Sequence, residues 1–335
     1  MLNKGDSEVN SVTQFSVELL FRSPVRLGVA GLDDQSTSLT IPADRLFSWL
    51  ALGWIRLYGA DDFMNEVVSD FNAGNPTFVL SDGFPVQNGE PFVPIPTWFN
   101  SVQVGKQNSN NTQVDTKKNR GKWMDLQSFI AQLRGVAAAS DQTLSQPVRS
   151  ALLQSVCIKR GFGENSEPYL TGAVVPADES ISRSIEYKMF LELRKPSIKS
   201  KLSTALEFLR EEGLGGNRSS GLGALESVRL VELAKPIART VPSPSVFALL
   251  SPCIPTDSML SSITNSDAGC NNYVLGRRSG WIYDETGRAT DFRKPLVSLF
   301  ESGSLFTVRP EGRLADISVG ANTCYRYGIP FVLEG

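Results

Sequence analysis

Residues 185–233 read IEYKMFLELRKPSIKSKLSTALEFLREEGLGGNRSSGLGALESVRLVEL, and this stretch decides the fold class. Its opening positions alternate between apolar and polar side chains, which is typical of a half-buried strand. Residues 202–212 then place leucines at helical spacing, with Ser200 suited to cap the helix and Gly213 suited to end it. Residues 225–233 again have the composition of a strand. The segment therefore predicts a strand, a helix, a glycine-rich loop and a second strand.

A similar order of elements is predicted near the start of the chain. Residues 13–22 alternate as a strand, and a helix follows whose first turn contains Pro42 and whose end is marked by Gly59. Short apolar runs broken by Pro and Gly across residues 76–99 predict further strands. Joined to the later segment, these elements form the β-α-β…β-α-β order of a ferredoxin-like (RRM-related) domain, with a polar insertion near residues 101–182.

A cluster of prolines marks the most plausible domain boundary. Pro236, Pro242 and Pro244 interrupt the pattern of strands and helices. We assign residues 1–236 to the first domain and residues 237–335, which are mostly strand-like, to a smaller second domain. The predicted fold class is therefore α+β, with two ferredoxin-like domains of which the second is degenerate and β-rich.

The charge composition excludes several classes of function. The 335 residues include 33 Lys and Arg against 35 Asp and Glu, so contact with a nucleic acid would need a local basic patch or backbone amides. Histidine is absent, which excludes Ser-His-Asp and Cys-His catalysis and a histidine general base. An enzymatic function is therefore disfavoured, and the sequence predicts no metal and no cofactor.

Cysteine spacing and hydropathy indicate the compartment. The cysteines lie far apart with no CxxC pair, which predicts buried free thiols in a reducing environment; they are Cys157, Cys253, Cys270 and Cys324. No segment approaches the length of about 20 apolar residues that a membrane span requires, and the first residues have no apolar signal core. We expect a soluble protein of the cytoplasm.

The most informative stretch is the glycine-rich loop, residues 213–223. Glycine lets the backbone approach a ligand closely, so that successive amides can point at one anion. An arginine adds a two-pronged phosphate partner, and serine hydroxyls add further donors. The loop therefore predicts a cradle for a phosphate backbone, formed by Gly213, Gly215, Gly216, Asn217, Arg218, Ser219, Ser220, Gly221 and Gly223.

Two familiar nucleotide-binding motifs do not match this loop. No lysine follows a glycine in the register of a Walker A motif, and Arg218 stands where the dinucleotide fingerprint has its third glycine. Both motifs run from strand through loop to helix, whereas here the helix precedes the loop. The remaining alternative is a flexible connection, which explains Gly213 as a helix cap but not the density of glycines around an Arg-Ser-Ser core.

Other basic residues are candidates for contact with a nucleic acid. Arg22 and Arg26 lie at the end of the first predicted strand. A basic run further along could contact an RNA backbone, and Trp123, which follows it, could stack on a base. A solvated loop is the alternative for that run, which consists of Lys117, Lys118, Arg120 and Lys122. Arg277 and Arg278 lie between glycines in a predicted turn and are weaker candidates.

The sequence contains pairs of adjacent acidic residues, one of which is a candidate for catalysis. Asp33 and Asp34 lie in a predicted loop and could hold a metal for phosphodiester cleavage, although adjacent acids in a polar turn are common and supply few ligands. Glu211 and Glu212 are interpreted as solvated charges at a helix end.

The glycine-rich loop between a helix and a strand resembles the signature of the RAMP superfamily of CRISPR proteins. Further motifs, in order along the chain, resemble the Csm-type subunits of type III-A effectors that bind the 5′ handle of the guide RNA (crRNA). These motifs are PADRLFSWL (42–50), VLSDGFPV (79–86), FVPIP (92–96), SRSIEY (182–187) and RYGIPFVLEG (326–335).

The resemblance implies a non-catalytic subunit of a type III effector ribonucleoprotein in antiviral or antiplasmid defence. It further implies three partners, namely the 5′ tag of crRNA, the large polymerase-like subunit and the first backbone RAMP subunit. A RAMP-type endoribonuclease that processes precursor crRNA is the alternative, and the absence of histidine disfavours it. A related subunit of another type III complex is a further alternative.

Overall fold

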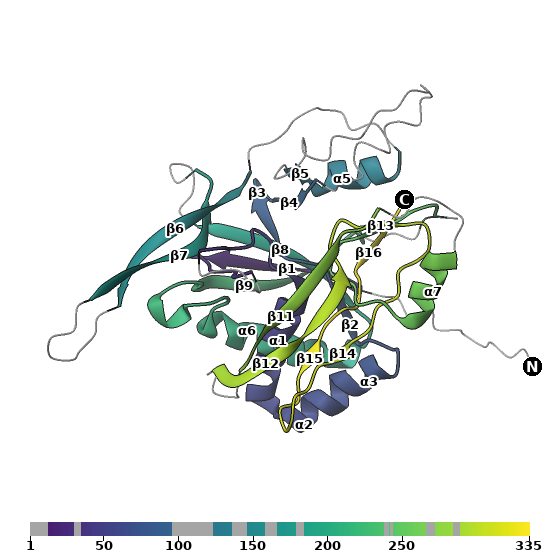
Figure 1. Ribbon diagram of the computed structural model, residues 1–335. Coiled ribbons are helices and arrows are strands. Elements are labelled where there is room, and N and C mark those ends of the chain that lie inside the picture. Colours follow the sequence, from purple (N-terminus) through teal and green to yellow (C-terminus); the bar gives the residue numbers. More distant parts are fainter. Residues whose placement is uncertain are drawn as a thin grey trace, which may run out of the picture.

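The structure is a computed structural model, and Figure 1 shows the arrangement of its elements. The residues that it describes are 13–29, 35–95, 123–135, 146–157, 166–178, 184–237, 241, 244–265, 272–283 and 289–335. Outside them lie several residues singled out above: Asp33, Asp34, Lys117, Lys118, Arg120, Lys122 and Cys270. Among the described helices, none is both long and apolar enough to cross a membrane.

The largest sheet consists of β1 (Thr13–Phe21), β2 (Phe78–Leu80), β3 (Phe84–Gln87), β4 (Glu90–Pro94), β5 (Trp123–Asp125), β8 (Ile185–Leu193) and β9 (Leu225–Glu232). Its strands run in the order β5-β4-β3-β8-β1-β9, with β2 also paired to β8, and every pairing is antiparallel. Along the chain β1, α1 and β2 come before the insertion, and β8, α6 and β9 come after it.

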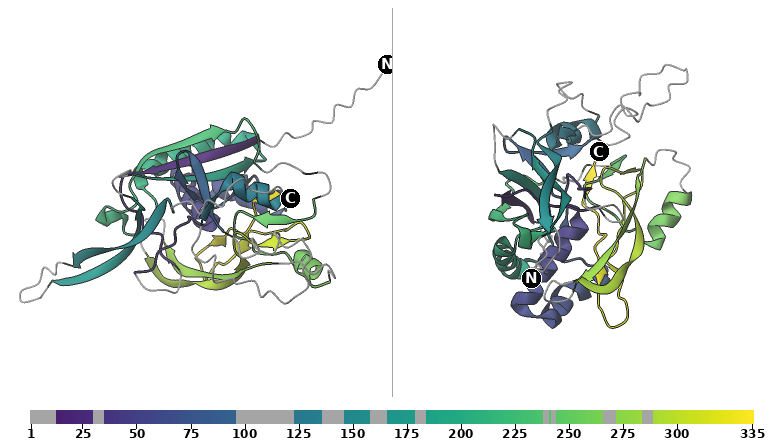
Figure 2. Two further views of the ribbon diagram at one scale, coloured as in Figure 1. Left: turned by 90° about the horizontal axis from the view of Figure 1, so that it is seen from above. Right: turned by 60° about the vertical axis from the view of Figure 1, so that its left-hand side comes forward.

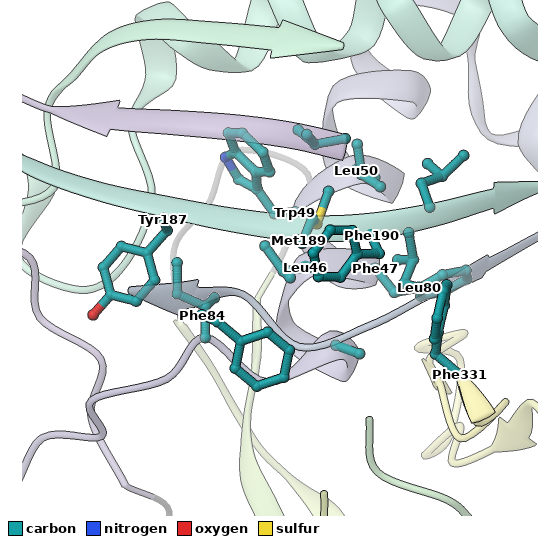
Figure 3. Close-up of a cluster of buried hydrophobic side chains, with 14 of the residues drawn as sticks. Leu46, Phe47, Trp49, Leu50, Leu80, Phe84, Tyr187, Met189, Phe190 and Phe331 are labelled. Carbon is teal, nitrogen blue, oxygen red and sulfur yellow. The ribbon is translucent and has the colours of Figure 1, made fainter. Parts of the chain in front are cut away.

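Two helices, α1 (Ala43–Tyr58) and α6 (Lys199–Glu212), pack against each other and against this sheet. Figure 3 shows Leu46, Trp49 and Leu50 of α1 beside Met189 of β8, all within the main hydrophobic core. Gly53 lets the helices approach closely, since a Cβ there would lie 2.7 Å from Leu209 Cγ. The core therefore forms where the apolar faces of the helices meet the sheet.

Two details of the predicted helices are wrong. The second helix begins at Lys199, after a 3-10 turn (Pro196–Ile198), so Ser200 lies inside it and does not cap it. The sequence spacing of Leu46, Leu50, Trp54 and Leu57 predicts one apolar stripe on α1, but Leu57 is exposed. After α1 the chain continues through α2 (Ala60–Phe63), a π-helical turn (Met64–Val68) and α3 (Ser69–Asn72), which the sequence did not predict.

The insertion between β4 and β8 contains regular structure. Its described part holds β5, the helix α5 (Leu126–Leu133) and a long hairpin of β6 (Val148–Cys157) and β7 (Glu167–Pro176). Figure 1 shows this hairpin projecting from the body of the molecule. Trp123, considered as a base-stacking residue, is buried in β5.

The second part of the chain is β-rich, as predicted. It contains β10 (Phe247–Leu249), α7 (Asp257–Asn265), β11 (Leu275–Tyr283), β12 (Ala289–Phe300), β13 (Leu305–Phe306), β14 (Ala315–Asp316), β15 (Tyr325–Arg326) and β16 (Val332–Glu334). The views in Figure 2 show it lying alongside the first domain. Arg277 and Arg278 lie in strand β11, so the prediction of a turn there is wrong. Cys253 is buried as expected, but Cys157 is exposed.

The two parts of the chain share one hydrophobic core and are joined by specific polar contacts. The Tyr327 ring stacks on Phe47 with centroids 5.2 Å apart, and its hydroxyl accepts a hydrogen bond from the Leu80 N–H at 2.8 Å. Asp44, in the first turn of α1, forms an ion pair with Arg326 at 2.6 Å, with both side chains at most 10% exposed. Because buried pairs of this kind are costly to break, the second part is firmly held against the first.

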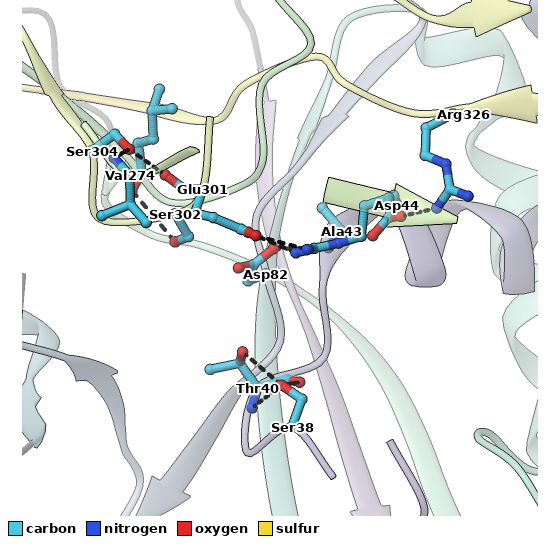
Figure 4. A network of polar contacts seen from close by, with 12 residues as sticks. Ser38, Thr40, Ala43, Asp44, Asp82, Val274, Glu301, Ser302, Ser304 and Arg326 are labelled. Carbon is cyan, nitrogen blue, oxygen red and sulfur yellow. Dashed lines mark hydrogen bonds and ion pairs between the residues drawn. The ribbon is translucent and has the colours of Figure 1, made fainter. Parts of the chain in front are cut away.

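Asp82 lies at this junction, in the turn between β2 and β3 (Figure 4). Its Oδ1 accepts a hydrogen bond from the Ala43 N–H at 2.8 Å, so it caps α1 from a distant part of the sequence. Burial raises the pKa of the Asp82 carboxyl well above its usual value, and the charges of Glu301 and Asp44 raise it further. The cap is therefore held as a neutral acid more readily than an exposed aspartate would be.

We predict that Asp82→Asn is at least as stable as the native chain at pH 7. The raised pKa means that the unfolded chain releases the proton first, so native stability falls as pH rises above the ordinary aspartate pKa. An Asn side chain keeps the oxygen that accepts the Ala43 N–H, but it does not ionise, so its contribution to stability does not depend on pH. Urea denaturation between pH 4 and pH 8 should show an advantage of about 1 kcal/mol at neutral pH that vanishes towards pH 4. A variant less stable at every pH would contradict this account.

Candidate nucleic-acid interface

The glycine-rich loop connects α6 to β9 and is docked on the segment that follows β1. The Gly216 N–H donates to the Arg26 carbonyl at 3.0 Å, and the Gly223 N–H donates to the Pro24 carbonyl at 2.8 Å. The Arg22 N–H in turn donates to the Ala224 carbonyl at 3.0 Å. The structure thus brings the loop together with two candidates that are far from it in the sequence, Arg22 and Arg26.

Most of the glycines serve this docking rather than a ligand. Gly223 has φ 69°, and a Cβ there would lie 1.9 Å from the Leu214 carbonyl oxygen. Gly215 has φ 104°, and its Cβ would lie 2.6 Å from the Arg26 carbonyl oxygen. The density of glycines is therefore a requirement of backbone packing, which gives the loop a definite shape.

The tip of the loop has the geometry of an anion-binding nest. Asn217 is in the left-handed conformation (φ 56°, ψ 33°) and is followed by a 3-10 turn (Arg218–Ser220). A left-handed residue followed by right-handed ones turns successive amides towards one point. Within the described part of the chain, the amides of Asn217, Arg218 and Ser219 donate no hydrogen bond. These three N–H groups can therefore donate hydrogen bonds to one or two oxygens of a phosphate.

Arg218 lies at the C-terminal end of α6 beside a shared carboxylate. Its Nη1 donates to the Glu212 carbonyl at 3.2 Å and lies 3.6 Å from the Glu212 carboxylate. That carboxylate also accepts Arg56 at 2.8 Å, so Glu212 is engaged and is not the free solvated charge expected from the sequence. The guanidinium of Arg218 is thereby held against the C-terminal end of α6, while about a third of its side chain stays exposed.

Trp49 anchors the start of the loop to helix α1. This buried side chain donates from Nε1 to the Gly213 carbonyl at 3.0 Å, across 164 positions of sequence. The bond satisfies a carbonyl at the end of α6 that has no partner within the helix. The position of the loop therefore depends on α1 as well as on β1.

Arg45 is a candidate that the sequence reasoning missed. Its Nη2 donates to the Gly28 carbonyl at 2.6 Å, and Arg26 Nε and Nη2 lie 3.9 Å from where a Cβ on Gly28 would be. Burial lowers the pKa of Arg45, and the charges of Arg278, Arg326 and Arg26 oppose the attraction of Asp44. A cation in the first turn of a helix also opposes the helix dipole, and this unfavourable placement was the available signal.

A polar groove of about 340 Å³ lies next to the loop. Arginines and glutamates from α6, the loop, β9 and the segment after β1 line it, among them Arg22, Arg210, Glu212, Arg218 and Glu226. The groove is lined by charges of both signs, unlike a purely basic phosphate channel. Such side chains can hydrogen-bond to the donors and acceptors on nucleobase edges as well as to a phosphate backbone. Ser219 and Ser220 are exposed at the loop tip.

The open face of the main sheet offers no stacking platform. Every aromatic residue of β1, β8 and β9 is buried: Phe15, Phe21, Tyr187 and Phe190. Glu18 instead pairs with Lys188 at 3.4 Å and with Arg229 at 2.8 Å on that face. RRM domains stack bases on sheet aromatics, and β1, β8 and β9 present none on this face. The described residues also contain no group of three His, Cys, Asp or Glu placed to hold a metal ion.

The family comparison agrees with the motifs noted in the sequence. Residues 244–334 match the model of the CRISPR Csm4 C-terminal domain. The protein "CRISPR system Cms protein Csm4" of Streptococcus thermophilus is 26% identical over 285 residues, which cover 84% of this chain and 86% of that protein. A protein of the same name from Mycobacterium tuberculosis (strain H37Rv) is 28% identical over 308 residues, 89% of this chain and 91% of that protein.

The chain is a Csm4 homologue. Csm4 proteins are RAMP-type subunits, so the resemblance inferred from the motifs is confirmed. Solved structures agree in fold: the Csm4-containing "Csm1-Csm4 cassette in complex with cA4" matches with a TM-score of 0.57 at 17% identity, covering 96% of this chain and 97% of that one. The "Csm3-Csm4 subcomplex in the type III-A CRISPR-Cas interference complex" matches with a TM-score of 0.56 at 14% identity, covering 96% and 98%. The mixed α/β architecture with antiparallel sheets is that of Csm4 and its structural neighbours.

The packing of this Csm4 homologue predicts unequal roles for two loop glycines. Gly223→Ala should cost about 2–4 kcal/mol of unfolding free energy, because the new Cβ meets a backbone carbonyl and the positive φ is strained. Gly221→Ala is the matched control, since its φ of 86° is also positive but nothing lies within 4 Å of the new Cβ. The control should cost about 1 kcal/mol. Equal losses in urea denaturation would show that the loop is not docked as described.

Proposed function

We propose that this chain is the subunit of a type III CRISPR effector complex that binds the 5′ tag of crRNA. In this proposal the nest of Asn217, Arg218 and Ser219 holds a phosphate of the tag. Arg22 and Arg26 adjoin the loop, and Arg45 lies near Arg26 through its hydrogen bond to Gly28. Together they supply the local positive charge that the nearly neutral chain lacks overall. The observation that carries the proposal is the set of three adjacent amides without an acceptor, beside these arginines.

The proposal includes two protein partners. The large polymerase-like subunit and the first backbone RAMP subunit are named for relatives by the Csm1–Csm4 and Csm3–Csm4 structures. A subunit at one end of a RAMP filament needs two contacts. One is to the neighbouring backbone subunit, and the other is to the large subunit that occurs only at that end. We propose that this chain makes both contacts.

We also propose that the second domain is a degenerate ferredoxin-like unit. β10 lies between β13 and β16, α7 follows β10, and β11 pairs with β12, whose Phe300 forms an isolated bridge with Cys253 in the segment after β10. If β12 is placed with β13 beside β10, the order β11-β12/β13-β10-β16 parallels the order β3-β8-β1-β9 of the first domain. Residues 307–331, with the short β14–β15 pair, take the place of the second helix.

We propose that the subunit is not a nuclease, because the chain has no histidine to act near neutral pH. Incubation of the purified chain with repeat RNA tests this directly. Cleavage at one site, lost in a variant of the loop, would favour the alternative of a precursor-processing endoribonuclease.

We predict that Arg218→Ala weakens binding of an RNA carrying the 5′ tag about tenfold and lowers the salt dependence of binding by about one counterion. The reason is the loss of one guanidinium beside the nest, with the fold unchanged because the side chain is part-exposed. Both effects are measured by the affinity of the assembled complex for the tagged RNA at several salt concentrations.

Arg210→Ala provides the control for this experiment. Arg210 lines the same groove but is paired with Glu207 and Glu211 on the helix surface. Its removal should change binding much less. Equal losses in both variants would mean that general electrostatics, not the loop, bind the RNA.

A further prediction separates binding from stability at Arg45. Arg45→Gln removes a cation that is crowded by other arginines, so the free chain should melt at the same or a higher temperature. RNA retention should nevertheless fall about tenfold. Arg229→Gln, an equal charge change on the open sheet face, is the control for both measurements. A loss of stability together with unchanged RNA retention would assign Arg45 a purely structural role.

A further inference from the structure

The hairpin of β11 and β12 exposes an unusual amount of apolar surface. Leu275 is 66% exposed and Leu296 is 61% exposed, the highest values among large hydrophobic residues of the described chain. Phe292 and Trp281 on the same hairpin are 47% and 43% exposed. Solvent-exposed apolar side chains gathered on one element mark an interaction surface more often than isolated ones do.

The charged side chains that the structure describes on these two strands are of one sign. Among the residues of the two strands whose side chains the structure describes, every charged one is basic: Arg277, Arg278, Arg293 and Lys294. Arg278 is neutralised by two hydrogen bonds to Glu301, at 2.7 and 2.6 Å, whereas Arg277 and Arg293 are exposed. Arg293 lies over the Trp281 ring at 4.6 Å from its centroid. An apolar surface edged by cations fits a partner with an apolar patch edged by carboxylates.

The surface is held rigidly by the opposite face of the hairpin. Ile282 and Leu299 are 4% and 1% exposed, and Leu299 packs on Ile254 and Ile317 in a small core of its own. The paired Glu301 side chain follows directly on β12. Figure 1 shows the hairpin running across the front of the molecule. A partner would therefore meet a preformed surface and would not have to order it.

We propose that this exposed hairpin surface, centred on Leu275, Trp281 and Leu296, is the docking surface for the large polymerase-like subunit. The inference rests on the proposed function, which supplies that partner. Its centre is aliphatic as well as aromatic, and one face of the Trp281 ring is covered by Arg293. Single-stranded nucleic acid binds to open aromatic faces, whereas aromatic and arginine anchors that a partner encloses are typical of protein interfaces.

The position of the hairpin in the chain favours the large subunit over the backbone subunit. The hairpin belongs to residues 244–334, the part that matches the Csm4 C-terminal domain model. In a head-to-tail stack the contact between backbone subunits repeats, whereas the contact to the large subunit is made once, at the end. We assign the surface on the C-terminal domain to that single contact.

The test is co-purification of the full chain with the large subunit, the backbone subunit and crRNA from the same host. The double substitution Leu275→Ser and Leu296→Ser should weaken capture of the large subunit about tenfold or more, while the backbone subunit and crRNA remain bound. The control is Val231→Ser with Leu260→Ser, which removes two exposed apolar side chains from other surfaces. Arg277→Glu should weaken the same interaction, and more strongly at low salt.

Each outcome decides the inference. Unchanged capture of the large subunit by the double variant, with its melting temperature intact, would overturn it. A loss of crRNA or of the backbone subunit with the large subunit retained would also overturn it, because the surface would then belong to another partner. If the native chain captures the large subunit but carries no crRNA, the RNA-binding proposal fails while the docking surface stands.

Discussion

The arrangement of this molecule depends on how the N-terminus of α1 is fixed. Asp82 accepts the Ala43 N–H with its side chain and donates its own N–H to the Leu250 carbonyl at 2.8 Å. One buried residue thus ties a turn of the main sheet, the first helix and the second domain together. Asp44, one position along the helix, adds the buried ion pair with Arg326. Because an ionised carboxylate is costly to bury, the raised pKa of Asp82 allows this crowded junction to form without a third full negative charge.

The same helix positions the candidate RNA site. Arg45 reaches the Gly28 carbonyl from its first turn, and Trp49 holds the Gly213 carbonyl one turn later. The glycine-rich loop is therefore not an independent ligand loop, since its shape is set by contacts to α1 and to the backbone after β1. A loop so constrained loses little conformational freedom when it binds, which favours affinity from few donors.

Strands and helices with a strong period were predictable, because each buries one face against the core. β1, β8, β9, α1 and α6 follow from alternation or helical spacing in the sequence. Long-range contacts were not predictable from the sequence. The hydrogen bond from Trp49 to Gly213, for example, leaves no pattern in the residues around either position. Glycines misled twice: they suggested a turn at Arg277 and Arg278, which lie in a strand, and they suggested ligand contacts where Gly215 and Gly223 serve backbone packing.

The distribution of charge explains how a chain with a net charge of −2 can suit an RNA-binding role. Carboxylates neutralise the arginines that build the junction, as Asp44 does for Arg326 and Glu301 for Arg278. Arg45 is crowded by these cations, and its guanidinium hydrogen-bonds only a neutral carbonyl, at Gly28, in the described part of the chain. Under the proposed function, a phosphate of the RNA would neutralise this cluster. Stability given up at Arg45 in the free chain would then reappear as affinity, and the site and the junction would be two consequences of one packing arrangement.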